Sequence, residues 1–183
     1  MSKLKSFAIS LLLTCGSLLV LIYVNRPATT PKLRLITENV FLTSQLKPEH
    51  ILPLWKRGFH SVIDFRPDGE DKVQPSSSEI KAAAEKLGMA FYYIPVPHES
   101  IPDSAVDALS AAFADAPGAS VLYCRTGRRA VRIFALAEAS RADGPAAEDL
   151  IKMVRRVGFS ADDLRERIAE RISHRSSNPA PKN

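Results

Sequence analysis

Residues 121–134 read VLYCRTGRRAVRIF, and this stretch places one cysteine, Cys124, between an apolar run and four arginines. The preceding run 120–124, SVLYC, is short and almost continuously apolar, as is typical of a strand buried on both faces. The segment 128–144, RRAVRIFALAEASRADG, has a helix-like pattern, and Gly127 stands directly before it. The pattern therefore predicts an inner strand that ends at Cys124 and turns at once into a helix.

The position of Cys124 indicates a reactive thiol. In a sheet of parallel strands, ligands bind beyond the carboxyl ends of the strands. The N-terminus of the following helix directs backbone N–H groups and the positive end of its dipole to that place. Arg125, Arg128 and Arg129 add positive charge, which favours a thiolate. The alternative is a buried, unreactive cysteine beside a solvated basic surface.

Strand-like and helix-like segments alternate along the rest of the domain. Runs rich in β-branched and aromatic residues predict strands at 39–44, 61–65, 90–96 and 120–124. Helix-like segments are found at 48–59, 76–88, 103–118, 128–144 and 146–172, the last interrupted at 158–160. Ser76 and Glu79 have the spacing of a capping box. This order predicts an α/β fold in three layers, a parallel-rich sheet with helices on both faces.

Composition limits the number of domains and the classes of function. The 183 residues are 45% hydrophobic and 25% charged, which suits one folded domain, and the net charge of +5 favours anionic partners. The four histidines have no metal-ligand spacing, and no phosphate-binding glycine motif occurs. The arginines cluster around one loop, so we expect no nucleic-acid partner. We therefore expect neither a metal nor another cofactor.

The N-terminus predicts a membrane anchor. Residues 7–24 carry no charge and follow Lys3 and Lys5. As a helix these 18 residues span roughly 27 Å, close to the bilayer's hydrocarbon core. The alternatives are a cleaved signal peptide, although no small-residue cleavage site follows, a lipoprotein signal at Cys15, and a buried core helix.

These patterns divide the chain into four parts. We expect an uncleaved signal anchor over 1–25, a proline-containing linker over 26–34, a catalytic domain over 35–173 and a disordered tail over 174–183.

Three segments, ITENVFLTSQLKPEH (36–50), VIDFRPDGEDKVQPSSSEI (62–80) and YCRTGRRA (123–130), follow one another in a familiar order and spacing. Together they resemble the beta-lactamase-hydrolase-like phosphatase family, a bacterial branch related to dual-specificity and tyrosine phosphatases. The resemblance covers about residues 35–172. It implies a phosphotyrosine-phosphatase-like fold and hydrolysis of phosphomonoesters through a phosphocysteine intermediate.

The resemblance also implies roles for residues of the loop. Cys124 would be the nucleophile, and Arg129 would bind two phosphate oxygens with its planar guanidinium group. Backbone N–H groups would bind the remaining oxygens, and the residues that supply them are Arg125, Thr126, Gly127, Arg128 and Arg129 itself.

The resemblance further implies a general acid on the loop after the strand that precedes the cysteine strand, PVPHESIPD (95–103). His98 and Glu99 are the preferred candidates, and the sequence does not choose between them. We expect Asp103 to be the N-cap of the next helix. Asp68 is a further candidate, although its position beside Gly69 favours a turn residue.

Two features depart from typical tyrosine phosphatases. Four residues separate Cys124 from Arg129 where five are usual, and Ala130 stands where a hydroxyl residue would follow the arginine. A loop of this length is similar to that of rhodaneses, in which the cysteine carries a persulfide. Two alternatives therefore stay open: a sulfurtransferase acting on a sulfane-sulfur substrate, and a non-catalytic, anion-binding pseudophosphatase.

With the predicted anchor, the resemblance implies a single-pass protein of the bacterial inner membrane. The basic residues flanking the anchor are nearly balanced, and we favour a periplasmic domain. An exposed thiolate is vulnerable in an oxidising compartment, which argues for the cytoplasmic side instead.

Overall fold

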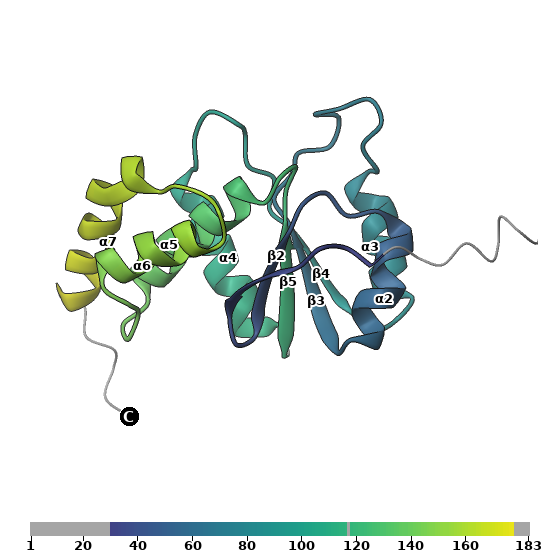
Figure 1. Cartoon of the computed structure of the whole chain (residues 1–183), viewed down its shortest axis with the longest axis horizontal. Coiled ribbons are helices and arrows are strands. Elements are labelled where there is room, and N and C mark those ends of the chain that lie inside the picture. Colours follow the sequence, from purple (N-terminus) through teal and green to yellow (C-terminus); the bar gives the residue numbers. More distant parts are fainter. Residues whose placement is uncertain (1–29, 117, 178–183) are drawn as a thin grey trace, which may run out of the picture.

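The computed structural model describes residues 30–116 and 118–177, which contain a five-stranded sheet (Figure 1). The strand order is β1-β2-β5-β3-β4. The first strand is antiparallel to its neighbour and the other pairings are parallel. In chain order the strands are β1 (Arg34–Thr37), β2 (Val40–Thr43), β3 (Phe59–Asp64), β4 (Ala90–Tyr93) and β5 (Ala119–Tyr123). The predicted parallel-rich sheet is confirmed.

Strand β5 lies between two parallel neighbours, and this position determines where the cysteine loop emerges. Tyr123 is in register with Thr43 of β2 and with Asp64 of β3. The three strands therefore end at the same edge of the sheet. Figure 1 shows the long loops after β3 and β4 rising from that edge, beside the turn that joins β5 to α5.

Helices cover both faces of the sheet. Helices α2 and α3 lie on one face and α4 to α7 on the other (Figure 1). Their bounds are α2 (Ile51–Lys56), α3 (Ser77–Glu85), α4 (Asp103–Asp115), α5 (Arg128–Ser140), α6 (Ala147–Arg156) and α7 (Arg165–Ser177). Two 3-10 turns, η1 (Pro48–His50) and η2 (Asp162–Leu164), precede α2 and α7. The structure thus has the three predicted layers.

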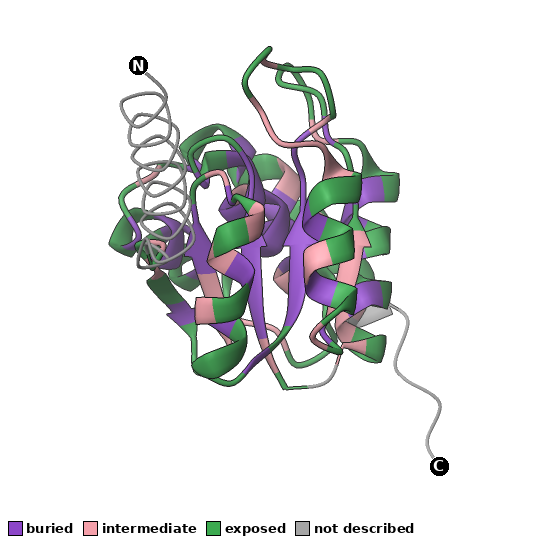
Figure 2. Cartoon of the chain, turned by 90° about the vertical axis from the view of Figure 1, so that its right-hand side faces the viewer, coloured by how far each residue is buried: buried purple, intermediate pink, exposed green. Residues whose placement is uncertain are grey.

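The core is divided by the sheet because successive residues of a strand point to opposite faces. On β3 and β5, Val62 and Val121 pack in the cluster beneath α2 and α3. Their neighbours Ile63 and Leu122 pack in the larger cluster beneath α4 to α7. Figure 2 shows the inner strands as almost continuously buried. Burial of each such side chain is favourable by roughly 1.5–3 kcal/mol, so the sheet is held rigidly between its helices.

Helix α3 begins at the predicted capping box. The Ser76 hydroxyl accepts a hydrogen bond from the Glu79 N–H (3.3 Å), and the Ser76 N–H donates to the Glu79 carboxylate (2.8 Å). This prediction is confirmed, because both partners are local in sequence and satisfy N–H groups that the first turn leaves without helical acceptors.

The ends of the predicted domain differ slightly from the structure. The last residue of the predicted linker, Arg34, begins β1. Helix α7 continues to Ser177, so residues 174–177 of the predicted tail are helical.

No helix in the described ranges is long and apolar enough to cross a bilayer. The predicted anchor, 1–25, lies outside the described residues, as do 26–29 of the linker and 178–183 of the tail. The anchor therefore stays a prediction.

Candidate active site

Cys124 directly follows β5, and the loop after it wraps around the sulfur. The Gly127 N–H donates a hydrogen bond to the Cys124 Sγ at 3.2 Å. Gly127 is also the N-cap of α5, and its carbonyl accepts the first helical hydrogen bond, from Val131. The sulfur thus lies at the N-terminus of a helix, where backbone N–H groups stabilise negative charge.

The loop requires a glycine at this position. Gly127 has a φ of +99°, a conformation that residues with a side chain rarely adopt. A Cβ there would lie 3.1 Å from the Leu42 Cγ and 3.3 Å from the carbonyl oxygen of Thr43. The close approach of the loop to β2 therefore depends on the absence of a side chain.

The Arg129 side chain is held in place by two acceptors. The residue is only 9% exposed. Its Nη1 donates to the carbonyl oxygen of Val96 (2.5 Å), and its Nη2 pairs with the Glu70 Oε1 (2.6 Å). A guanidinium group has five N–H donors, so these two contacts leave donors for a bound oxyanion.

Glu70 joins Arg129 to a second buried arginine. Its Oε2 accepts from the Arg66 Nε at 2.7 Å, and Arg66 also donates to the side-chain oxygen of Gln45 (2.8 Å). We call Arg66, Glu70 and Arg129 the inner triad. Burial raises the pKa of Glu70, but hydrogen bonds from the two arginines outweigh it and the net effect lowers the pKa. One carboxylate between two guanidinium groups leaves the triad itself with a net positive charge.

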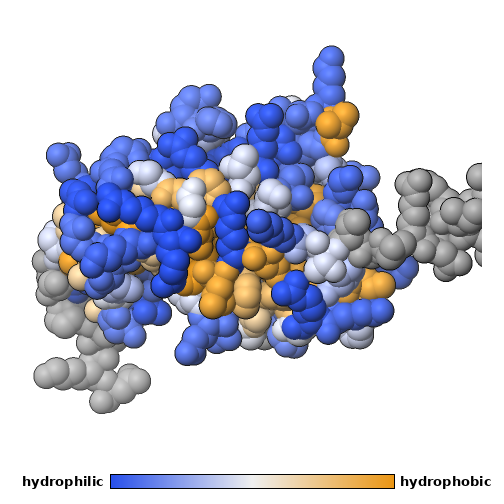
Figure 3. Space-filling view, viewed as in Figure 1, coloured by the Kyte–Doolittle hydropathy of each residue, from blue (hydrophilic) through white to orange (hydrophobic). Residues whose placement is uncertain are grey.

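A cavity of about 610 Å³ lies over the loop. It brings together predicted residues from two parts of the sequence: Cys124, Arg125, Thr126, Arg128 and Arg129 from the cysteine loop, and His98 and Glu99 from the loop after β4. Gly127 contributes its backbone beneath them. Figure 3, in the same view as Figure 1, shows hydrophilic side chains over most of the upper edge of the molecule, where these loops emerge.

The two aspartates considered from the sequence are engaged elsewhere. Asp68 accepts hydrogen bonds from the backbone N–H and the hydroxyl of Ser77, both at 2.6 Å, at the start of α3. The predicted N-cap role of Asp103 is wrong. The N-cap of α4 is Pro102, and Asp103 is the first helical residue. Its carboxylate binds Arg167 and Arg171 of α7 instead, because that helix packs nearby.

Sequence reasoning missed several residues of the site. Glu70 stands two positions after Asp68, yet only the buried Arg129 shows why a carboxylate is needed there. The cavity is completed by Pro97, Ser100 and Ile101 of the expected acid loop, by Arg132 of the arginine cluster, and by three residues that no local motif indicates, namely Asp163, Leu164 and Arg167. The last three come from η2 and α7, far along the chain from Cys124.

Three features define a phosphatase-like class of α/β domain: a cysteine directly after an inner parallel strand, a glycine-dependent turn, and an arginine in the first helical turn. The chain belongs to the beta-lactamase hydrolase-like protein family, in its phosphatase-like domain, whose family model matches residues 32–141. The resemblance stated from the sequence is confirmed. The match ends before Ile172, so α6 and α7 lie outside it.

Curated relatives share this domain. A beta-lactamase hydrolase-like protein of Xylella fastidiosa is 33% identical over 103 residues, and one of Agrobacterium fabrum is 34% identical over 104 residues. These matches cover 56% and 57% of the chain. They cover only 24% of each relative, so the chain spans about a quarter of the length of these relatives.

Solved structures extend the likeness over more of the chain. A candidate phosphatase of Neisseria meningitidis has a TM-score of 0.64 and 25% sequence identity. The similarity covers 80% of this chain and 99% of that one. The family and this likeness support a phosphatase, and thus a hydrolase.

Proposed function

We propose that the chain is a cysteine-dependent phosphatase that hydrolyses phosphomonoesters through a phosphocysteine intermediate. The thiolate of Cys124 attacks phosphorus, an Sγ–P bond forms and the P–O bond to the leaving group breaks. An acid donates a proton to the leaving oxygen. Water then attacks phosphorus, which releases inorganic phosphate and restores the thiolate.

One observation carries this proposal: the Cys124 Sγ accepts the Gly127 N–H at the start of α5, next to the buried Arg129. The same positive surroundings suit a thiolate before the attack and a phosphoryl group after it. Arg129 is held by Val96 and Glu70, so its remaining donors need little reorganisation to bind two phosphate oxygens.

The proposed general acid is His98 or Glu99. Both line the cavity that contains Cys124. The ion pairs of Asp103 and the hydrogen bonds of Asp68 make these aspartates poorer candidates. To choose, His98→Asn and Glu99→Gln are compared on aryl phosphates of graded leaving-group acidity. Loss of the acid should make kcat/KM, which reports on the step that expels the leaving group, depend steeply on that acidity. The other variant should keep the wild-type dependence.

The main experiment compares two cysteine variants of the full-length protein. Wild type and Cys15→Ser should release phosphate from aryl phosphates, and Cys124→Ser should lose at least about 10³-fold in kcat/KM. Rapid quenching and mass spectrometry should detect one phosphoryl group on Cys124. Equal hydrolysis by Cys124→Ser would remove the thiol from the mechanism.

The sulfurtransferase alternative is supported by the four-residue spacing between Cys124 and Arg129. The same preparations are therefore treated with thiosulfate. A cyanide-labile sulfur on Cys124, without phosphate release from esters, would replace the phosphatase proposal by sulfur transfer. Binding of phosphate without either product would indicate a pseudophosphatase.

The predicted anchor adds a proposed location to this activity. An anchored domain would act near the surface of the bacterial inner membrane. Reporter enzymes fused to the C-terminus, one active in the periplasm and one in the cytoplasm, measure which side carries the domain. We expect the periplasmic reporter to be active, and an active cytoplasmic reporter would reverse the orientation.

A further inference from the structure

The wall of the cavity beyond the cysteine loop carries positive charge of its own. Arg132, on the second turn of α5, and Arg167, on α7, line it together with the apolar side chains of Ile101 and Leu164. Neither arginine belongs to the loop that is proposed to hold the phosphate. At about 610 Å³, the cavity has the volume of sites that enclose whole organic ligands, so it has room for a second recognition point.

Arg132 is a mostly buried cation with incomplete partners. Its side chain is 12% exposed, and its Nη2 pairs with Asp163, whose side chain is 62% exposed. Within the described ranges, the buried Nε of Arg132 has no hydrogen-bond partner. A buried donor without an acceptor is costly, so protein groups satisfy the Arg132 side chain only in part.

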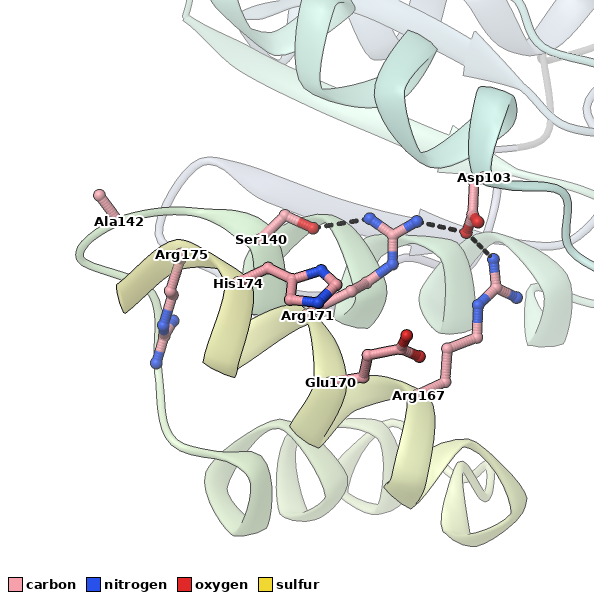
Figure 4. Close-up of a pocket in the computed structure, with 8 residues that line it drawn as sticks. All are labelled: Asp103, Ser140, Ala142, Arg167, Glu170, Arg171, His174 and Arg175. Carbon is pink, nitrogen blue, oxygen red and sulfur yellow. Dashed lines mark hydrogen bonds and ion pairs between the residues drawn. The ribbon is translucent and has the colours of Figure 1, made fainter. Parts of the chain in front are cut away.

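Arg167 shares its counterion with another arginine. Figure 4 shows the Asp103 carboxylate between the guanidinium groups of Arg167 and Arg171. We call these three residues the outer triad. Arg167 also donates to the carbonyl oxygen of Ile101 at 2.6 Å, which positions its guanidinium group. One carboxylate between two guanidinium groups leaves one positive charge uncompensated within the triad.

The two counterions are more exposed to water than the arginines with which they pair. Asp103 is 71% exposed at its side chain, against 28% for Arg167. Water screens the exposed carboxylates well, so they neutralise the arginines only in part. An anion that enters the cavity would form charge-assisted hydrogen bonds with these guanidinium groups, and such bonds are stronger than those between neutral groups.

We propose that Arg132 and Arg167 form a second anion subsite, and that the substrates are small organic phosphomonoesters that carry a second anionic group. The inference rests on the proposed phosphatase function, because it assigns the first anionic group to the Cys124 loop. Arg167 lies outside residues 32–141, so the family match does not itself predict this subsite.

The test uses the full-length protein and pairs of isosteric substrates. The ortho, meta and para isomers of carboxyphenyl phosphate are each compared with the corresponding carbamoylphenyl phosphate. For the best isomer, wild type should prefer the carboxylate by about tenfold in kcat/KM, as expected for one charge-assisted contact. A ratio near one for all three isomers would overturn the proposal.

Single substitutions test which arginines cause the preference for the carboxylate substrate. Arg167→Gln and Arg132→Gln should each reduce the ratio to about twofold or less. Arg175→Gln is the matched control. Arg175 lies on the same helix and lines the neighbouring cavity of about 440 Å³, which Arg167 also lines, but it is not among the residues that line the Cys124 cavity. Its ratio should equal that of wild type. If Arg167→Gln and Arg132→Gln both keep the wild-type ratio, the proposal is overturned.

Two further variants act in the opposite direction and do not depend on losing an arginine. Asp163→Asn and Asp103→Asn remove the competing carboxylates, so the preference should rise about two- to fivefold. Circular dichroism of each variant is the control for folding, and each spectrum should match that of wild type. A falling or unchanged ratio would show that the arginines do not bind the second anionic group.

Binding to Cys124→Ser, measured by calorimetry, separates this proposal from the proposed function. Equal affinity for the carboxyphenyl and carbamoylphenyl phosphates would overturn the subsite and leave the phosphatase proposal standing. No affinity for phenyl phosphate or inorganic phosphate would overturn both. Tighter binding of the carboxylate, lost on addition of Arg167→Gln, would support the subsite.

Discussion

The inner and outer triads have the same composition, one carboxylate between two arginines, but they differ in depth. The carboxylate of the inner triad, Glu70, is 20% exposed, whereas that of the outer triad, Asp103, is 71% exposed. The inner triad connects the loop after β3 to the start of α5, and the outer triad connects α4 to α7. The same set of ionic groups therefore occurs at two depths and joins two different pairs of elements.

Depth determines what each triad can do. Charges near water interact weakly because water and salt screen them, and exposed pairs contribute about 0–1 kcal/mol to stability. Water screens the charges of partly buried groups less. The loss of one such charge therefore costs more, because its partners keep charges that neither water nor another group compensates. The inner triad can therefore hold a catalytic side chain in place, and the outer triad can exchange its partners for a ligand.

The largest effect is expected at the inner triad. Arg129→Lys keeps the charge but removes the planar pair of donors, and kcat/KM on aryl phosphates should fall by about 10³-fold. Arg171→Lys, the matched change in the outer triad, should leave kcat/KM within about twofold of wild type. Steady-state kinetics on both variants measures the difference. If the two variants lose kcat/KM to the same extent, the two triads do not differ in function.

A smaller effect is expected when Arg129 loses its support. Glu70→Gln keeps the shape of the side chain and removes its charge, so Arg129 should be misplaced without being lost. We expect kcat to fall by about 10- to 100-fold while KM changes less than threefold, because the interaction acts in the transition state. The free energy of unfolding should also fall, by about 1–3 kcal/mol. Unfolding in denaturant measures it, and a change in KM alone would refute the positioning role.

A buried carboxylate beside the inner triad makes stability depend on pH. Burial raises the pKa of Asp64 from 3.8 to about 6, although a hydrogen bond from the Arg66 N–H offsets part of this. The folded state thus binds the proton more tightly than the unfolded state. The contribution of Asp64 to the free energy of unfolding should therefore decrease between about pH 4 and 6, by about 3 kcal/mol in total. Asp64→Asn should remove this dependence in denaturant unfolding at a series of pH values, and an unchanged slope would contradict the assignment.

The smallest effect is expected at the outer triad. Asp103→Asn should change the free energy of unfolding by less than about 1 kcal/mol at low salt, because its carboxylate is largely exposed. The difference from wild type should vanish in about 1 M salt. A loss as large as that of Glu70→Gln would mean that exposure does not distinguish the two triads.

Features that depend on neighbours in the sequence were predictable. The strand before Cys124, the helix after Gly127 and the capping box at Ser76 arise from local spacing, and the structure contains all three. The first residue of α4 was less predictable. Asp103 has the residue type of an N-cap, but the arginines of α7 bind its carboxylate, and a partner 64 residues away leaves no local pattern.

The candidate site likewise contains residues that could be predicted from the sequence and one that could not. His98 and Glu99 could be proposed because the family resemblance implies a general acid on the loop after the strand that precedes the cysteine strand, and both residues line the cavity that contains Cys124. Glu70 could not be chosen over Asp68, since both stand in one polar loop and only Glu70 reaches Arg129, 59 residues further along.

The sequence by itself determined that one cysteine stands between an inner strand and the positive start of a helix, because both elements follow from local periodicity and one glycine. Only the tertiary structure decided which charges surround that cysteine. The packing of the β3 loop and of α7 sets the depth of each ion pair, and depth controls how strongly water screens it.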